Sequence, residues 1–582
     1  MLVETGSIRC YSMLFRTCHA RFYYLVLYLC MGIFGVASSV LVTLPAQGQT
    51  VEICNNGIDD DGDKLIDCQD PDCPECVRFQ SCVQPNTCYM PPIWGVPVAG
   101  DQVFDSQDLV LSTNAPFTTV TIRSADGSYT NTVAVTSSGP TIVSLPLSVV
   151  MSNQVNTKQL NKGLIITSGE PVQATHRQTA FYNQDIIPLK CRAALGYAFY
   201  AGSQTRLAGN NVPNERHFVS VMATLDGTTV TIRSPIDLEG VTANVPVVVT
   251  LNAGQTYLVA SKLINNGANS ENKSVAGVLV TSDPDHPIVV NSGSQHTAQP
   301  YSGNRDAGMD QLVPARTVGT DYVAVHSGNT TPNSDYVFVV AIENNTTVTI
   351  SGPTTVGGTS SVLSTTVLQA GQVYTYNLPN GTQNRAFYIK TSRKAYTYHV
   401  SSYGANEFGM GLLPTINPCN GSKRIDFFRT SATSNDQAIV TIPTSGTSSL
   451  TFRGQPFSTY GTVIDQITIN GVPHSIISFP NASIAAAGNV NTLTSAERFH
   501  VGVVSNTGGG NTGNYGYYSN YEARVDMVNA NTGQPDDFFT VATVTVGSPV
   551  DYCLTLTSCG TTNTIKNIIP GKYTQSATFN NQ

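Results

Sequence analysis

The feature that most constrains this chain is an internal repeat. The pentapeptide Thr-Thr-Val-Thr-Ile occurs three times, beginning at Thr118, Thr228 and Thr346. The second and third copies are each followed at a similar distance by a matching segment, Leu-Asn-Ala-Gly-Gln-Thr-Tyr at 251–257 and Leu-Gln-Ala-Gly-Gln-Val-Tyr at 368–374. Because such self-similarity is the signature of stacked structural units, we expect the chain to fold as a tandem array.

The residues of the repeat predict β-strands. Val230 and Ile232 alternate with Thr229 and Thr231, which gives one dry and one wet face. The number of strand-like runs in the second repeat favours an all-β fold of tandem antiparallel β-sandwich (Ig-like) repeats. A β-propeller-like arrangement is the alternative, because each repeat also divides into two four-stranded blades. The seven runs are 197–201, 218–223, 228–232, 245–251, 256–260, 276–281 and 288–291.

The repeats and their flanking segments predict the domain organisation. Three repeats each end in a proline-bearing signature, at 185–188, 310–314 and 411–414, and a degenerate fourth unit follows them. We expect a signal peptide at 1–48, a Cys-rich acidic metal-binding module at 49–90, β units at 95–190, 191–314, 315–425 and 426–525, and a C-terminal β segment at 526–582 without an obvious domain close.

Composition narrows the possible partners. Only 12% of the 582 residues are charged and the formal net charge is −8. No cluster of Lys and Arg lies beyond the leader, so neither nucleic acid nor an anionic membrane is expected as the main partner. A surface rich in hydroxyl and amide groups is instead expected to meet an extracellular protein or a glycan.

The first residues resemble a secretion signal. The apolar run at 22–42 is preceded by Arg16 and Arg21 and followed by small residues that suit cleavage before Gln49. An uncleaved membrane anchor is the competing interpretation, because the run approaches the ~20 residues that span a bilayer. No comparable apolar run follows, so we expect no membrane span in the mature chain. The predicted location is secreted or at the cell surface.

Cysteine use agrees with export. Ten cysteines follow the leader, and six of them fall within a short stretch that we expect to be stapled by disulfides, at Cys54, Cys68, Cys73, Cys76, Cys82 and Cys88. A zinc site is the rival, but the only CxxC pair has no second pair at finger spacing. Cys191 and Cys419 each follow a proline-bearing signature, and the sequence leaves open whether they pair with each other or with neighbours.

The acidic loop between these cysteines predicts a structural calcium site. Calcium prefers six to eight oxygen ligands, and alternating aspartates in a tight loop supply them. Lys64 occupies the position that is usually glycine, and a solvated acidic turn held by disulfides is the alternative interpretation. The expected ligands of Ca²⁺ are Asp59, Asp61, Asp63, the Leu65 carbonyl, Asp67 and Asp70.

Two resemblances follow from these residues. Residues 54–73 resemble the MopE-type metal-binding motif of exported bacterial proteins, which implies the metal-ligand role only for the five aspartates named above. Residues of about 95–425 resemble the N-terminal domain family of the IgGFc-binding proteins, through the segments 287–293, 310–314 and 319–323. That family usually has an aromatic residue where Val318 stands here. The resemblance implies an extracellular binding or adhesive role, but not immunoglobulin binding, which belongs to animal members with further Cys-rich modules.

No catalytic set is expected, so the chain is predicted not to be an enzyme. His176, His296 and His399 fall in roughly equivalent parts of three repeats, but their neighbours differ and no Gly-x-Ser-x-Gly motif accompanies them. The leading hypothesis is an adhesin-like binding protein with a structural calcium loop. The alternatives are accessory modules of an enzyme that acts on extracellular polysaccharide, and a structural matrix component.

Overall fold

The computed structural model describes residues 86–95, 104–180, 184–203, 216–262, 274–283, 286–298, 305–326, 335–355, 357–403, 406–417, 420–429, 434–507, 513–519, 521, 527–528 and 535–536. The chain divides into two compact units, Met1–Val51 and Glu52–Gln582, and all described residues lie in the second. Of the helices in the described part, none is long and apolar enough to cross a membrane.

The first β unit contains two four-stranded antiparallel sheets, ordered β1-β8-β4-β5 and β10-β9-β3-β6. Its strands are β1 (Thr87–Met90), β3 (Phe104–Thr113), β4 (Thr118–Arg123), β5 (Thr130–Val135), β6 (Thr141–Ser144), β8 (Leu164–Ser168), β9 (Val172–Ala180) and β10 (Gln184–Pro188). The short strands β2 (Ile93–Trp94) and β7 (Met151–Ser152) pair in parallel, and α2 (Leu147–Val150) precedes β7.

The second unit repeats this order as β11-β16-β13-β14 and β18-β17-β12-β15. Its strands are β11 (Ala198–Tyr200), β12 (His217–Ala223), β13 (Thr228–Arg233), β14 (Val247–Leu251), β15 (Thr256–Ala260), β16 (Leu279–Ser282), β17 (Ile288–Ala298) and β18 (Arg305–Gln311). The 3₁₀ helices η4 (Cys191–Ala194) and η6 (Ala315–Thr317) flank it.

The third unit has the same two sheets joined by one long strand. β24 (Ala386–Tyr403) pairs over its first half with β19 (Gly319–Val325) and β21 (Thr346–Gly352), and over its second half with β20 (Tyr336–Ala341) and β25 (Asn406–Leu412). The edge strands are β22 (Ser361–Leu368), beside β21, and β23 (Val373–Asn377), beside β20.

The fourth unit is also built on one long strand, β32 (Val490–Thr507). β32 pairs with β26 (Ser422–Phe428), β27 (Ser434–Pro443), β28 (Thr451–Phe452) and β33 (Gly513–Tyr518). The remaining elements are β29 (Gln455–Pro456), β30 (Thr462–Ile469), β31 (Val472–Phe479), η7 (Thr444–Ser449), η8 (Phe457–Thr459), η9 (Asn481–Ser483) and the separate pair β34 (Met527–Val528) and β35 (Pro535–Asp536).

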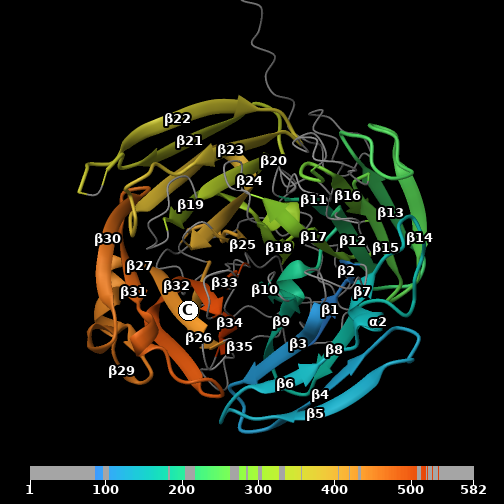
Figure 1. The fold of residues 1–582 in the computed structure, drawn as a ribbon, viewed down its shortest axis with the longest axis horizontal. Coiled ribbons are helices and arrows are strands. Elements are labelled where there is room, and N and C mark those ends of the chain that lie inside the picture. Colours follow the sequence, from blue (N-terminus) through green and yellow to red (C-terminus); the bar gives the residue numbers. More distant parts are fainter. Residues whose placement is uncertain are drawn as a thin grey trace, which may run out of the picture. The chain divides into compact units, whose positions relative to one another are not determined.

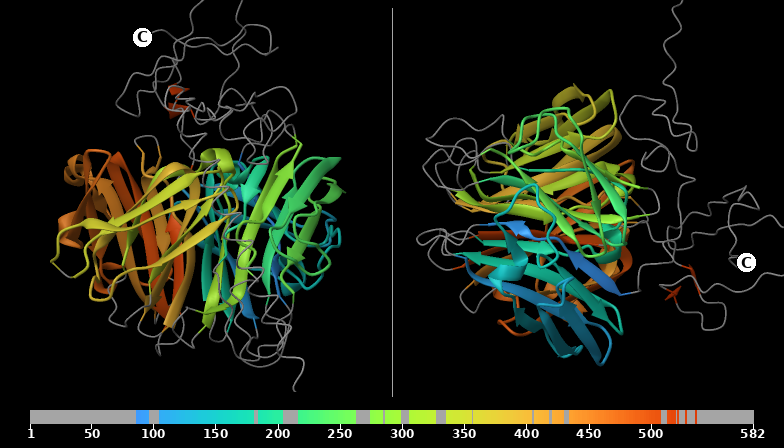
Figure 2. Two further views of the ribbon diagram at one scale, coloured as in Figure 1. Left: turned by 90° about the horizontal axis from the view of Figure 1, so that it is seen from above. Right: turned by 90° about the vertical axis from the view of Figure 1, so that its right-hand side faces the viewer.

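The four units are arranged as a propeller-like ring (Figure 1). The last strand of each unit lies at the centre: β10 packs against β18 and β33, and β25 packs against the same two strands. Figure 2 shows the strands running between the two faces of this ring, so the connections between them lie on those faces. The prediction of an all-β fold is confirmed: each unit is a two-sheet sandwich, and the propeller-like alternative describes how the units are arranged.

Packing on both faces of the sheets explains the apolar character of the inner strands. Every residue of β12 is buried. Val219 and Val221 pack in a core that the second unit shares with the third, whereas Met222 packs with Tyr89 and Ile165 of the first unit. A strand that is covered on both faces has little need for polar alternation. By contrast β13, nearer the outer edge, alternates as predicted, with Val230 and Ile232 fully buried.

The repeated Ala-Gly-Gln segment is a turn between two edge strands. Gly254 and Gly371 have φ of 76° and 79°, a conformation that glycine adopts without steric cost. The following glutamine closes each turn, because Gln255 Oε1 accepts a hydrogen bond of 2.7 Å from the Asn252 N–H and Gln372 Oε1 accepts one of 2.8 Å from Gln369 N–H. The Ala-Gly-Gln segment therefore recurs because the same turn needs a glycine with positive φ and a glutamine that accepts a backbone hydrogen bond.

In the first two units, a proline lies between the two strands that correspond to a single long strand in the third and fourth units. Pro171 separates β8 from β9, and Pro287 separates β16 from β17. Proline lacks the N–H that a ladder needs and restricts the residue before it, so the strand is interrupted. The corresponding strands β24 and β32 contain no proline and run through both sheets.

The central strand of the second repeat is missing from the runs that the sequence pattern predicts. Seven runs were expected in the second unit, and the structure adds an eighth, β18. Its sequence Arg-Asp-Ala-Gly-Met-Asp-Gln is polar, and only its last two residues belong to the proline-bearing signature at 310–314. Residues 307–311 of this strand are buried at the centre of the ring, where neighbouring strands satisfy the polar groups of Asp310 and Gln311.

Candidate functional site

The predicted calcium ligands lie outside the described residues, and the calcium site stays a prediction. This applies to Asp59, Asp61, Asp63, Leu65, Asp67 and Asp70. In the described part of the chain, no group of three or more His, Cys, Asp or Glu residues could hold a metal ion.

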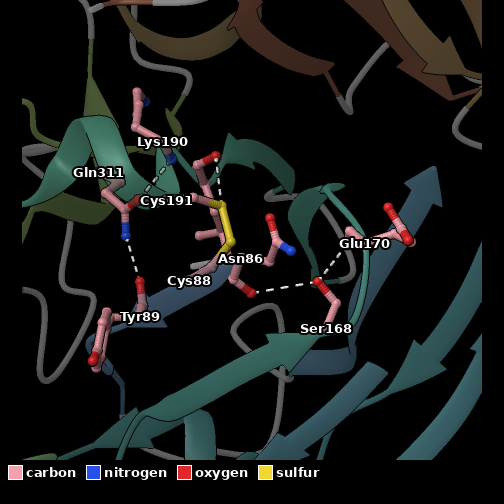
Figure 3. The surroundings of a disulfide bond; sticks show 9 residues. Asn86, Cys88, Tyr89, Ser168, Glu170, Lys190, Cys191 and Gln311 are labelled. Atoms are coloured by element: carbon pink, nitrogen blue, oxygen red, sulfur yellow. Dashed lines mark hydrogen bonds between the residues drawn. A yellow bond between two sulfur atoms is a disulfide. The ribbon is translucent and has the colours of Figure 1, made fainter. Parts of the chain in front are cut away.

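One of the six clustered cysteines belongs to the ring. Cys88 on β1 forms a disulfide with Cys191 in η4, with 4.1 Å between the Cα atoms (Figure 3). The bond joins the first strand of the first unit to the segment that opens the second. The sequence left open which cysteine pairs with Cys191. The structure shows that the partner is Cys88, and neither Cys419 nor a cysteine nearby in sequence.

The histidines that seemed equivalent occupy different positions in the sheet register. His176 lies opposite Ile187, one residue before Pro188, whereas His399 lies opposite Gly411, three residues before Pro414. The side chain of His296 lies outside the described part of the structure. Both histidines nevertheless lie on the strand that pairs with the last strand of their unit, β9 beside β10 and β24 beside β25, so they are equivalent by strand but not by register.

Six histidines in the described part of the chain are buried, and three of them show what surrounds these side chains. His176 Nε2 forms a hydrogen bond of 2.6 Å with Gln107 Oε1, and burial lowers the pKa of His176 to about 4. His500 Nδ1 forms one of 2.6 Å with Ser519 Oγ, and burial lowers the pKa of His500 to about 3. His399 Nε2 lies 3.3 Å from Asp335 Oδ2. Because a general base works best with a pKa near the working pH, the depressed pKa values of His176 and His500 make both poor bases.

The residues that carried the family resemblance have structural tasks. Gly293 has a φ of 148°, and a Cβ there would lie 2.3 Å from the Gly308 carbonyl oxygen on the neighbouring strand β18. The Tyr322 hydroxyl accepts a hydrogen bond of 2.8 Å from Gly319 N–H and donates to the Ala395 carbonyl. These contacts bring β17 close to β18 and fix the start of β19.

Buried carboxylates bridge the central strands, which have no backbone ladder between them. Asp185 Oδ2 on β10 accepts a hydrogen bond of 2.8 Å from Met309 N–H on β18. Asp310 Oδ2 on β18 accepts one of 2.9 Å from Leu412 N–H on β25. Sequence reasoning missed this role of both aspartates, although an aspartate three or four residues before the proline of the first two signatures was the available signal.

An open depression of about 530 Å³ lies on the third unit. It forms where β20 and β21 are connected, beside the start of β19 and the middle of β24. Its lining residues are Thr320, Glu343, Asn345, Ser392, Arg393 and Lys394. Arg393 and Lys394 are adjacent basic residues in a chain with few charges, and this signal was present in the sequence but was not used.

The depression is held in shape by its own polar groups. Arg393 Nη1 lies 3.0 Å from Glu343 Oε2, and the other oxygen of Glu343 accepts a hydrogen bond of 3.2 Å from Lys394 N–H. Ser392 Oγ accepts one of 2.8 Å from Thr347 N–H. With two cationic side chains and one buried carboxylate, the lining has an excess of positive charge, which suits an acidic group on a partner.

The ring of two-sheet units defines an all-β, propeller-like class of protein with a polar depression on its third unit. The family model of the IgGFc-binding proteins matches residues 185–505, from β10 to β32, which is more than half of the chain. The chain belongs to the IgGFc-binding protein family. Members of this family are typically extracellular binding proteins without enzymatic activity. No curated protein matches the chain.

Proposed function

We propose that this chain is an adhesin-like protein, secreted or displayed at the cell surface, that recognises an extracellular protein or glycan through the depression on the third unit. The family match over 185–505 carries the proposal, because that range includes the whole of the third unit. The excess of positive charge in the depression supports an acidic group as the recognised feature. Immunoglobulin binding does not form part of the proposal.

The binding proposal is tested with the full chain on arrays of acidic and neutral glycans and of extracellular matrix proteins. We expect saturable binding to at least one acidic probe, and a loss of roughly tenfold in affinity for Lys394→Glu, since the variant reverses a charge in the depression. Lys262→Glu is the matched control, because Lys262 is an exposed cation on the second unit. Binding that weakens equally in both variants would place the site elsewhere.

The calcium loop is proposed to stabilise the segment before the ring and not to contact the partner. Calorimetric titration of the full chain with Ca²⁺ is expected to give heat that chelator abolishes, and Asp59→Asn with Asp61→Asn is expected to remove it because two ligand charges are lost. Unchanged heat in the double variant would rule out this loop as the site.

A further inference from the structure

A lysine and an aspartate from different units meet at the centre of the ring. Lys190 follows β10, the last strand of the first unit, and Asp310 lies on β18, the last strand of the second. Lys190 Nζ contacts Asp310 Oδ1, and their side chains are only 1% and 2% exposed. The amine and the carboxyl group are thus held together in an interior that excludes water.

Both residues are fixed by neighbouring contacts. Lys190 N–H donates a hydrogen bond of 2.7 Å to Gln311 Oε1, and Gln311 Nε2 donates one of 2.8 Å to the Tyr89 carbonyl (Figure 3). The residue after Lys190 is Cys191, which the disulfide to Cys88 anchors. Lys190 Nζ also lies 5.4 Å from the centre of the Tyr521 ring. Such preorganisation favours a reaction between the two side chains, because little motion remains to be lost.

The carboxyl group of Asp310 is surrounded by donors. Leu412 N–H donates to Oδ2 at 2.9 Å, and Gln311 N–H donates to Oδ1 at 2.8 Å. Donors in these positions stabilise the negative charge that develops on a carboxyl oxygen when its carbon is attacked. A second carboxylate, Asp185, is hydrogen-bonded to Met309 N–H, next to Asp310 in sequence.

Burial moves both groups toward the forms that react. Burial lowers the pKa of Lys190, against the opposing charges of Asp310 and Asp185. Burial raises the pKa of Asp310, against the opposing charge of Lys190. Transfer of a proton from ammonium to carboxylate gives a neutral amine next to a neutral acid, which an apolar interior tolerates better than two ions. Lys262 and Asp237 form an exposed pair at 3.3 Å and lack this environment.

We propose that Lys190 and Asp310 form an intramolecular isopeptide bond. The lone pair of the neutral Lys190 Nζ attacks Cγ of protonated Asp310, and a C–N bond forms. The C–O bond to the hydroxyl group then breaks, and one proton from Nζ moves through the Asp185 carboxylate to the leaving hydroxyl, which departs as water. No oxidant or reductant is involved. The product is an amide that links the first unit to the second.

Mass spectrometry of the purified full chain tests the bond. After reduction of the disulfides, we expect a mass about 18 Da below that of the unmodified chain with the same measured N-terminus, because one water is lost. A digest is expected to contain one branched peptide that joins the Lys190 and Asp310 peptides, with no tryptic cleavage after Lys190. Lys262 and Asp237 serve as a control within the molecule and are expected to remain unlinked.

An unmodified mass, with trypsin cleaving after Lys190, would show an ordinary ion pair only and would overturn the proposal. This outcome needs no variant and does not depend on folding of an altered chain.

Three variants examine the chemistry. Asp310→Asn is expected to give the same amide with loss of about 17 Da, since ammonia leaves in place of water. Lys190→Arg is expected to show no loss of water. Asp185→Asn is expected to lower the linked fraction at least tenfold, because the proton relay is removed while the reacting pair remains. Complete linkage in Asp185→Asn would exclude Asp185 from the reaction, and absence of loss in Asp310→Asn would contradict the attack at this carbon.

Discussion

Three buried histidines make the fold sensitive to acid. Burial lowers the pKa of His176 to about 4 and those of His217 and His500 to about 3, all below the value of an exposed histidine. Since the unfolded chain binds protons at these sites more readily than the folded chain, stability is full above about pH 6.5 and is lost as the pH falls toward the folded values. Each histidine costs about 1.4 kcal/mol per pH unit in that window.

We therefore expect the free energy of unfolding to fall steeply between about pH 6 and pH 4. His176→Gln is expected to reduce the slope by about one proton, because the glutamine amide can still meet Gln107 but does not titrate. Denaturant unfolding at several pH values measures this. A slope unchanged by His176→Gln would show that the acid sensitivity arises at other groups.

Residue-level chemistry was the part of the molecule that the sequence predicted least. Alternation in 228–232 was sufficient to predict a half-buried strand, because the cause is local. Lys190 and Asp310, by contrast, are separated by 120 residues in sequence. Nothing in their neighbourhoods indicates the contact, since it depends on how two units pack. The pairing of Cys88 with Cys191 could not be predicted for the same reason, because it also depends on how the units pack.

At the level of elements, the turns between strands carry much of the specificity of the fold. Gly277 has a φ of 85°, and a Cβ there would lie 2.1 Å from the Gly371 carbonyl oxygen, in the repeated turn of the third unit. Gly227 has a φ of 74° but nothing within 4 Å of a Cβ. Gly227 is therefore needed only for its backbone conformation. Gly277 is needed both for its conformation and for the close approach of the second and third units.

We expect Gly227→Ala to destabilise the protein by about 1–2 kcal/mol through its backbone conformation alone. Gly277→Ala is expected to cost about 2 kcal/mol more, because the backbone of the third unit must also move. Thermal and denaturant unfolding of both variants provide the comparison. Equal costs would mean that the turn at Gly371 yields without strain.

Element boundaries were predictable where proline or glycine punctuates the chain, and not where polar strands are buried. The proline-bearing signatures at 185–188 and 310–314 were recognised as repeat landmarks, but their strands β10 and β18 were not. A buried strand that contains Asp and Gln lacks the alternation of apolar and polar residues from which a strand is predicted. Its polar groups are satisfied by neighbouring strands, which only the assembled ring provides.

At the level of the whole molecule, side-chain contacts join the first unit to the fourth, and a disulfide joins the first unit to the start of the second. Arg177 on β9 donates a hydrogen bond of 3.0 Å to the Phe428 carbonyl on β26, which joins the first unit to the fourth. Ile186 of β10 packs into the core of the fourth unit. The disulfide between Cys88 and Cys191 spans 103 residues of sequence and encloses the first unit.

Removal of this disulfide is expected to cost about 3–5 kcal/mol, because a loop of about 100 residues gains much conformational entropy in the unfolded chain. Cys88→Ala with Cys191→Ala is the variant, and the midpoint of denaturant unfolding under non-reducing conditions is the measurement. The control compares the wild-type chain and the variant under reducing conditions, where their midpoints are expected to coincide because this disulfide is then absent from both. A midpoint that stays in place would show that the first unit is held by its packing alone.

The prolines between β8 and β9 and between β16 and β17 bear on how the ring opens. In the first two units a break in the backbone ladder separates the two sheets, so each sheet can exchange its amide hydrogens in a separate opening event. In the third and fourth units, β24 and β32 belong to both sheets. We therefore expect the amide hydrogens of the two sheets to exchange in the same opening event. One half of the ring is thus divided into small cooperative units, and the other half opens in larger ones.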